Sequence, residues 1–459
     1  MNRYLRSAFL AALIPLVVTG CGNDYLKCAA CITSPNAPTA ATSTQRIVAV
    51  QAKLTQFLNG NLARVVSMWM QQAAGTQLQY QTLDQYLIDG DLSSSDFNMP
   101  YTGGGLIDLR AIEASSVASG DKTFLGIAQV VKAWEIGTLA DVWGDVPYTQ
   151  AAKPDSFPTP AYDPQKVVYD SVLASLDQGI ANLTSGAGAG PGNAEIVYRG
   201  NRTLWLQLAH TLKARFYLHL AERDPGNYVK ALAEANQGIS SNAADYLTAQ
   251  SSNANEQNDW YQFLLTGTRT GFERAGKYGV DLLKGLGDPR LAEYYQKGIG
   301  ATDYIGATPG QSLQGTMATF SAKRLAPDYR QPLVTFNENL LIKAEALFNI
   351  GNTQAALDTL NYERAAWATA TTWHSALTLP PVSGPATLAV IMREKYITLF
   401  QNVEAWNDYK RTCLPALVPA NGGVALPGRM LYTNSERQTN PKVPADPVLN
   451  WNDPQGCGS

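Results

Sequence analysis

A helix–turn–helix unit with one apolar face occurs three times in this chain, and this repetition limits the possible folds more than any other feature. Apolar residues repeat at helical spacing in each unit, so each must bury a face against another element. In the first unit, Asp121 is predicted to cap the first helix, Gly144 to end it, and Pro164 to begin the second helix. In the third unit, Asn337 is predicted to cap the first helix. The helices of the three units are predicted at residues 121–143 and from 164, at 201–222 and 228–239, and at 338–350 and 353–368.

Two further helical segments and two insertions complete the pattern. Residues 44–75 are typical of an antiparallel helix pair, and residues 388–412 are typical of one long helix. The third unit has the small residues and length of a tetratricopeptide repeat, which is about 34 residues long. Because long insertions at about 76–105 and 250–335 separate the units, the repeats are not in tandem. We therefore predict an all-α fold in which tetratricopeptide-like pairs form a right-handed superhelical scaffold with loop-rich insertions.

Aromatic residues in or beside the insertions are the ligand-binding candidates. Long loops in a compact protein are usually functional. The electron-rich face of an aromatic ring suits the C–H edges of a pyranose, and neighbouring amides and carboxylates can bind its hydroxyls. Filling the core is the alternative role for each ring. The candidates are Trp69, Tyr86, Tyr101, Trp260 and Tyr261.

The first residues are typical of an export signal. Arg3 and Arg6 precede an apolar stretch too short to span a bilayer, and small residues then lead to Cys21. This pattern predicts a lipoprotein signal peptide over 1–20 and a mature chain that starts with an acylated Cys21. The alternative is an ordinary secretory signal that happens to contain a cysteine. Several acyl chains would anchor the protein firmly to a membrane.

The four other cysteines suggest disulfides in an exported protein. Cys28 and Cys31 lie in the predicted N-terminal tail, residues 21–43, and we expect Cys413 to pair with Cys457. A redox or zinc role for Cys28 and Cys31 is the alternative to a bridge. Zinc would need a second ligand pair, and the chain has only three histidines. We therefore expect no metal and no cofactor.

Composition and motifs favour binding over catalysis. A net charge of −3 provides no basic field for nucleic acid. The metalloprotease, nucleophile-elbow and phosphate-loop motifs are all missing from the sequence. Pairs such as Asp89 and Asp91 have the chemistry of a glycosidase, but solvated loop charges explain them as well. We expect no enzymatic activity, and keep a surface glycan-degrading enzyme and a protein-binding scaffold as alternatives.

Five blocks, in order, resemble proteins of the SusD/RagB family. The first is an aromatic-Gly-Asp-Val-Pro-Tyr turn at the end of a helix, and the next two match the second and late repeats. The last two are similar to the C-terminal helix of the branch with short loops. In sequence order the blocks read AWEIGTLADVWGDVPY at 133–148, LKAR at 212–215, ENLLIKAEA at 338–346, EKYITLF at 394–400 and EAWNDYKR at 404–411.

The resemblance implies a nutrient-binding lipoprotein anchored at the surface of the outer membrane. Such a protein holds an oligosaccharide, or in some relatives a peptide, and delivers it to a SusC-type TonB-dependent transporter. It also implies one helical domain over 44–415, with a coil-rich tail, 416–459, packed on it. The matched blocks are scaffold, so we expect Trp134, Trp143 and Trp406 to lie in the core.

Overall fold

The computed structural model describes residues 41–420, 425–447, 449–454 and 457. Of these residues 51% are helical and 5% are in strands, which confirms the all-α fold. Cys21, Cys28 and Cys31, with the predicted signal peptide, lie outside the described residues. Residues 1–42 form a unit separate from 43–459, and the description below concerns the second unit alone.

The first predicted helix pair is present, with the predicted boundaries. α8 (Lys122–Trp143) begins after Asp121, whose side chain accepts the N–H of Phe124, and ends at Gly144. Its partner α9 (Gln165–Ser185) begins after Pro164. The two helices approach closely at Gly126, where a Cβ atom would lie 2.9 Å from the carbonyl oxygen of Gly179. Larger residues there would push the pair apart.

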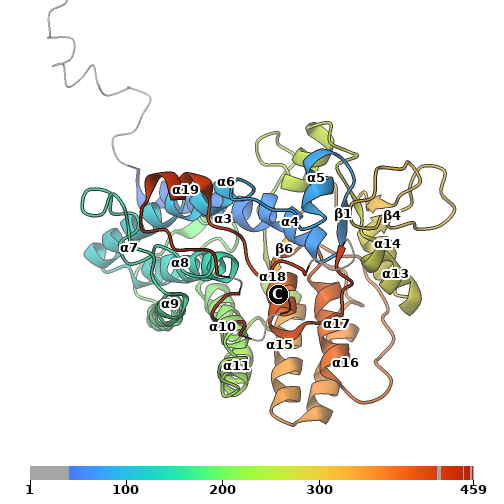
Figure 1. The fold of residues 1–459 in the computed structure, drawn as a ribbon. Coiled ribbons are helices and arrows are strands. Elements are labelled where there is room, and N and C mark those ends of the chain that lie inside the picture. Colours follow the sequence, from blue (N-terminus) through green and yellow to red (C-terminus); the bar gives the residue numbers. More distant parts are fainter. Residues whose placement is uncertain (1–40, 421–424, 448, 455–456, 458–459) are drawn as a thin grey trace, which may run out of the picture. The chain divides into compact units, whose positions relative to one another are not determined.

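The other two pairs continue the stack. α10 (Arg202–His219) packs on α9 and on α11 (Asn227–Ala235), and α11 packs on α15 (Phe336–Asn349). α15 in turn packs on α16 (Thr353–Ala366). Figure 1 shows this succession, in which helices on either side of a long insertion become neighbours. The scaffold is therefore assembled from segments far apart in the sequence.

The predicted N-cap Asn337 is wrong. The cap of α15 is Thr335, whose side-chain oxygen accepts the N–H of Glu338, so Asn337 lies within the first turn. The Asn337 side chain instead donates to buried Glu363 at 2.9 Å. Asparagine and threonine are both good caps, and the sequence does not show which of them has an extended backbone.

The predicted antiparallel pair over 44–75 is also wrong. α3 (Ser43–Asn59) and α4 (Asn61–Trp69) are separated by Gly60 alone, which is too short a connection to reverse the chain. The N–H of Gly60 donates to the carbonyl of Gln56, so helical hydrogen bonding almost continues through the break. The segment ends in a short strand, β1 (Ala73–Gly75), and α7 (Leu106–Ser119) covers α3 and α8.

The predicted helix over 388–412 is two helices, α17 (Leu388–Thr398) and α18 (Glu404–Thr412). The break includes Gln401, whose φ of 61° lies in the left-handed region and cannot continue a right-handed helix. Gln72 binds this break, because its side-chain oxygen accepts the N–H of Gln401 at 2.9 Å. A residue more than 300 positions away in the sequence thus stabilises the break.

The two insertions contain short elements. Antiparallel strands β1 and β3 join the N-terminal helices to the second insertion, with Ala73 opposite Ala275. The first insertion contains α5 (Leu78–Leu83), α6 (Ser94–Asn98) and η1 (Met99–Tyr101). The second contains α12 (Asp259–Tyr261), η4 (Gln262–Thr266), β3 (Glu273–Ala275), α13 (Lys277–Leu286), α14 (Arg290–Tyr294), β4 (Tyr295–Gln296), β5 (Thr319–Phe320) and β6 (Pro332–Val334). The remaining short elements are η2 (Gly192–Ala194), η3 (Asn242–Ala244), β2 (Tyr246–Leu247) and α19 (Asn434–Thr439).

Buried ion pairs join α15 to α17 and α18. Glu345 of α15 accepts hydrogen bonds from Lys395 at 3.0 Å and from Arg411, whose Nη2 lies 2.7 Å away. Asp408 accepts from the same two cations, so the four side chains form a closed set. Burial alone would raise the pKa of Glu345, but Arg411 and Lys395 lower it to about 2. The charges are therefore paired and remain ionised.

A second buried set joins α10 to three other helices. Arg215 donates to Glu338 of α15 at 2.7 Å. The His219 ring lies between Asp141 of α8, 3.0 Å from its Nδ1, and Glu404 of α18. Burial alone would lower the pKa of His219, but these two carboxylates raise it to about 10. No local pattern predicts that this histidine is an ionised link between three helices.

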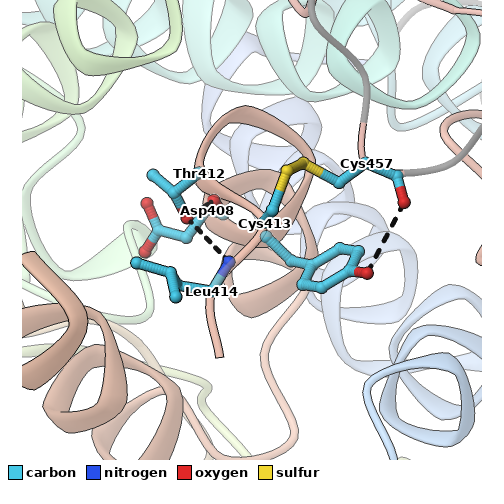
Figure 2. The surroundings of a disulfide bond; sticks show 6 residues. Asp408, Thr412, Cys413, Leu414 and Cys457 are labelled. Atoms are coloured by element: carbon cyan, nitrogen blue, oxygen red, sulfur yellow. Dashed lines mark hydrogen bonds between the residues drawn. A yellow bond between two sulfur atoms is a disulfide. The ribbon is translucent and has the colours of Figure 1, made fainter. Parts of the chain in front are cut away.

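The tail is attached to α18 by the disulfide between Cys413 and Cys457, the two cysteines expected to pair (Figure 2). The Tyr409 hydroxyl donates to the Cys457 carbonyl at 3.5 Å. Thr412 donates to the Asp408 carbonyl and accepts the N–H of Leu414, which closes the end of the helix. The end of α18 is therefore held by hydrogen bonds on both sides of the disulfide.

We predict that His219→Gln lowers stability in a pH-dependent way. Because the folded-state pKa of His219 lies above its ordinary value of 6.5, its ionic contribution is complete below pH 6.5 and is lost as the pH rises through about 10. The deficit of the variant should be on the order of 3–5 kcal/mol at pH 6 and clearly smaller at pH 9.5. Urea unfolding of both proteins at both pH values measures it. An equal deficit at the two values would contradict a charged His219.

Candidate functional site

The two insertions meet the N-terminal helices at a polar groove. It consists of two cavities of about 490 and 710 Å³ that share Gln56, Asp259 and Gln262 as lining residues. α3 and α4 supply one wall. The first insertion contributes residues 92–103, and residues 249–269 contribute the opposite wall. We call this feature the insertion groove, and its parts the smaller and larger chambers.

A stack of cations and one ring lines the smaller chamber. The Arg64 guanidinium lies 4.1 Å from the centre of the Phe263 ring, and that of Arg269 lies 5.1 Å from it. Phe263 also packs on Tyr80, with ring centres 5.1 Å apart. Cations over a ring face are attracted by its quadrupole. The ring therefore positions two guanidinium groups at the chamber.

Two carboxyl groups of the smaller chamber are bonded to asparagines at the junction of α3 and α4. Asn61 donates to Asp96 at 2.7 Å, and Asn59 donates to Asp259 at 3.3 Å. Burial raises the pKa of Asp96 to about 6, against the effect of the Asn61 hydrogen bond. Burial also raises the pKa of Asp259. Gly60 lies between the asparagines, and a Cβ there would lie 2.3 Å from the Gln56 carbonyl oxygen.

The larger chamber is lined by amides and charged side chains. Its polar residues include Lys53 and Gln56 of α3 and Arg199 of the loop before α10, with three residues of the second insertion, Gln250, Glu256 and Gln257. Amides and carboxylates that lie side by side offer both donors and acceptors. This arrangement matches the alternating donor and acceptor character of sugar hydroxyls.

Three of the five predicted ligand-binding rings lie in the core, which corrects those predictions. Trp69 is 0% exposed, and its ring meets Trp406 edge to face with centres 5.2 Å apart. Trp260 is 1% exposed, its Nε1 donates to Asn59 at 3.2 Å, and it packs on Phe320. Tyr86 is 5% exposed and its hydroxyl accepts from Gln71. Protein atoms cover these rings, so no face is left for a sugar.

The other two candidates are half-buried and lie beside the insertion groove rather than in its lining. Tyr261 is placed between the lining residues Asp259 and Gln262. Tyr101 lines a separate small cavity of about 120 Å³ with Phe97 and Glu436. Both candidates therefore lie in segments that contribute to the groove, but the groove is lined mainly by the polar residues of those segments. Their role as ligand contacts stays a prediction.

Sequence reasoning missed the contribution of the scaffold itself. Gln56 and Arg64 lie on helices whose spacing predicts only packing, and Gln56 is an exposed residue among buried ones. Residues of the polar run 253–259, which precedes Trp260, do line the groove. This polar run was therefore the one feature of the sequence that indicated where the groove lies. The expected core residues Trp134, Trp143 and Trp406 are 1%, 0% and 0% exposed, which confirms that prediction.

Another cavity, of about 460 Å³, lies between α13 and residues 418–420. Its lining is more apolar, with Tyr278, Leu282 and Pro309. The one side-chain amide that lines it, Gln71, already donates to the Val418 carbonyl at 2.7 Å. The cavity offers few free hydrogen-bonding groups, so the insertion groove is the better candidate for a polar ligand.

In the part of the chain that the structure describes, no group of His, Cys, Asp and Glu is arranged to hold a metal ion. No described helix is long and apolar enough to cross a membrane. The protein therefore belongs to the class of helical, tetratricopeptide-like proteins in which insertions between the repeats form a polar groove.

The family of the protein follows from comparison with known sequences. Residues 35–433 match the model of the SusD-like family described as starch-binding and associating with the outer membrane. This match covers most of the chain, so the protein belongs to that SusD-like family. A search of curated proteins found no match.

Solved structures of the same fold cover nearly the whole chain. A SusD/RagB family protein from Bacteroides thetaiotaomicron is 21% identical, with 88% of this chain and 95% of that chain covered and a TM-score of 0.73. A chitin-binding SusD homologue from Flavobacterium johnsoniae is 19% identical, with 89% and 98% covered and a TM-score of 0.73. A SusD homologue from Bacteroides fragilis is 18% identical, with 90% and 100% covered and a TM-score of 0.71. The fold is therefore shared with SusD-like proteins at low sequence identity.

We predict that Trp260→Ala destabilises the protein rather than altering ligand contact. Removing a fully buried indole leaves a cavity and an unpaired Asn59 oxygen, at a cost of roughly 3–5 kcal/mol. Trp451→Ala is the matched control, because that ring is half-buried at the surface, and its cost should be about 1 kcal/mol. Urea unfolding measures both. Unchanged stability with weaker glycan binding would restore Trp260 as a ligand platform.

Proposed function

We propose that this protein is a surface lipoprotein that captures a glycan in the insertion groove and delivers it to a SusC-type TonB-dependent transporter. The main support is the groove itself, where two insertions that the repeats do not need meet one wall of the scaffold. A peptide is the alternative cargo. Binding, without bond cleavage, is the proposed activity.

The lining chemistry supports a glycan. The polar side chains of the larger chamber include both donors and acceptors around a space of about 710 Å³, a volume sufficient for several sugar rings. Gln56 is exposed where the chambers meet, with a free amide directed by a rigid helix. The helix fixes the backbone of Gln56, so only its side-chain rotamers have to be ordered on binding.

The relatives support the same class of ligand. The matching family is described as starch-binding, and one structural neighbour is a chitin-binding homologue. Starch and chitin are both polymers of pyranose rings, so the shared feature is the sugar ring and not one linkage. The family description also associates its members with the outer membrane, in agreement with the lipoprotein signal proposed at Cys21.

We predict that Gln56→Trp weakens glycan binding at least tenfold, because the indole would occupy the junction of the two chambers. Gln56→Ala should have a smaller effect, about threefold to tenfold, from loss of one amide at roughly 1 kcal/mol. Gln354→Trp and Gln354→Ala, at an exposed position of α16, are the matched controls and should bind normally. Isothermal titration with oligosaccharides from starch, chitin and acidic polysaccharides measures the affinities. Equal affinity for Gln56→Trp and the wild type would exclude this groove, and release of reducing sugar by the pure protein would show an enzyme instead.

We also predict that Cys21→Ser releases the protein from the membrane and from its transporter. The unmodified protein should fractionate with outer membranes, incorporate labelled palmitate and recover a TonB-dependent barrel in a pull-down from native membranes. The variant keeps the described fold, so its glycan affinity should be unchanged. A variant that still carries palmitate would refute acylation at Cys21. A wild-type pull-down without a barrel would refute the proposed partner.

A further inference from the structure

Four cationic side chains line the insertion groove. Arg64 and Arg269 line the smaller chamber, and Lys53 and Arg199 line the larger one. Three carboxylates face the same space, Asp96, Asp259 and Glu256. The numbers of positive and negative groups are nearly balanced, so the partners of each group decide which of them is free to contact a ligand.

The carboxylates are already bound by neutral groups of the protein. Asp96 accepts from Asn61 at 2.7 Å. Asp259 accepts from Asn59 and Gln250, each at 3.3 Å. Glu256 accepts from the Ser251 hydroxyl at 2.6 Å and from Asn253 at 3.1 Å. These amides and hydroxyls hold the three acids within the walls of the groove.

Three of the four cations, in contrast, have no carboxylate partner. In the described part of the chain, Lys53, Arg199 and Arg269 form no ion pair. The exposed guanidinium of Arg269 rests on the Phe263 ring, which leaves its donors available. The carboxylate paired with Arg64, Glu273, is 3.8 Å from an Arg64 Nε that makes no hydrogen bond. Unpaired guanidinium groups are forks for carboxylate or sulfate oxygens.

Arg199 also lies near a second guanidinium. Arg330 is half-buried, and its Nε donates to the Thr248 carbonyl at 2.7 Å. Burial lowers the pKa of Arg330, and the like charge of Arg199 lowers it further. Like charges repel each other, and an anion placed between them would remove that repulsion.

We propose that the insertion groove binds an acidic oligosaccharide, whose carboxylate or sulfate groups pair with Arg269, Arg199 and Lys53. This inference rests on the glycan-binding function proposed above and specifies its substrate class. The sugar rings occupy the amide-lined space near Gln56, while their acidic groups meet the cations of the two chambers. Starch and chitin are uncharged polymers, so this ligand differs from those named for the family and for its neighbours.

The test compares charged glycans with neutral partners of the same backbone. Full-length acylated protein in detergent is titrated with oligogalacturonate and its methyl ester, and with a sulfated galactan oligosaccharide and its desulfated form. We expect at least one acidic member to bind at least tenfold more tightly than its neutral partner. The carboxylate and sulfate arms identify which anion is recognised. Raising the salt concentration from 0.05 to 0.5 M should weaken that binding at least threefold.

Charge-removing variants locate the effect. Arg199→Gln and Arg269→Gln together should weaken binding of the acidic glycan at least tenfold and change binding of its neutral partner less than twofold. Lys166→Gln, at an exposed position on α9, is the matched control and should bind as the wild type does. Unfolding curves check that the double variant is folded. The comparisons of acid with ester and of low with high salt need only the wild-type protein, so they test the proposal even if the double variant does not fold.

The outcomes separate the two proposals. Preference for a neutral glycan, abolished by Gln56→Trp, would overturn the acidic class and keep the proposed function. Acidic binding that is unaffected by both Gln56→Trp and the double variant would place the ligand elsewhere and overturn the inference. If the protein binds no carboxylated or sulfated glycan, none of their neutral partners and no oligosaccharide of starch or chitin, both the proposed function and the acidic-ligand inference are wrong.

Discussion

The buried ionic contacts around Glu345 and His219 hold the scaffold together. Removing charges from water is costly unless each finds a partner, and an unpaired buried charge destabilises by several kcal/mol. Glu345 satisfies Lys395 and Arg411, while His219 satisfies Asp141 and Glu404, so α8, α10, α15, α17 and α18 are fixed relative to one another. Apolar packing alone would allow helices to slide, whereas paired charges specify one register. The long chain segments between these helices are therefore free to serve another purpose.

That freedom explains where the groove lies. Both insertions leave the stack and return to one surface, formed by α3 and α4. Trp260 fixes the second insertion there through its bond to Asn59, and Asn59 also holds Asp259 at the groove. Core packing and the groove lining thus share one residue. The insertions can vary without disturbing the repeats, in keeping with a fold that is shared at about 20% identity.

Local signals in the sequence were sufficient for much of the fold and for little of the groove. Asp121, Gly144 and Pro164 act within one helical turn, so α8 and the start of α9 were predictable. The break at Gln401 depends on Gln72, more than 300 residues away, and no local pattern encodes it. Rings such as Trp69 suit a core as well as a sugar, and spacing does not distinguish the two. Which cation lacks a partner is a property of three-dimensional neighbours.

The disulfide between Cys413 and Cys457 closes a covalent loop between residues that are 44 positions apart in the sequence. A protease that cuts once within this loop would leave both pieces attached, so a nicked molecule keeps its tail beside α18. Such damage would be invisible on a non-reducing gel and would appear only after reduction. Structural disulfides persist mainly in oxidising compartments, in agreement with a family described as associating with the outer membrane.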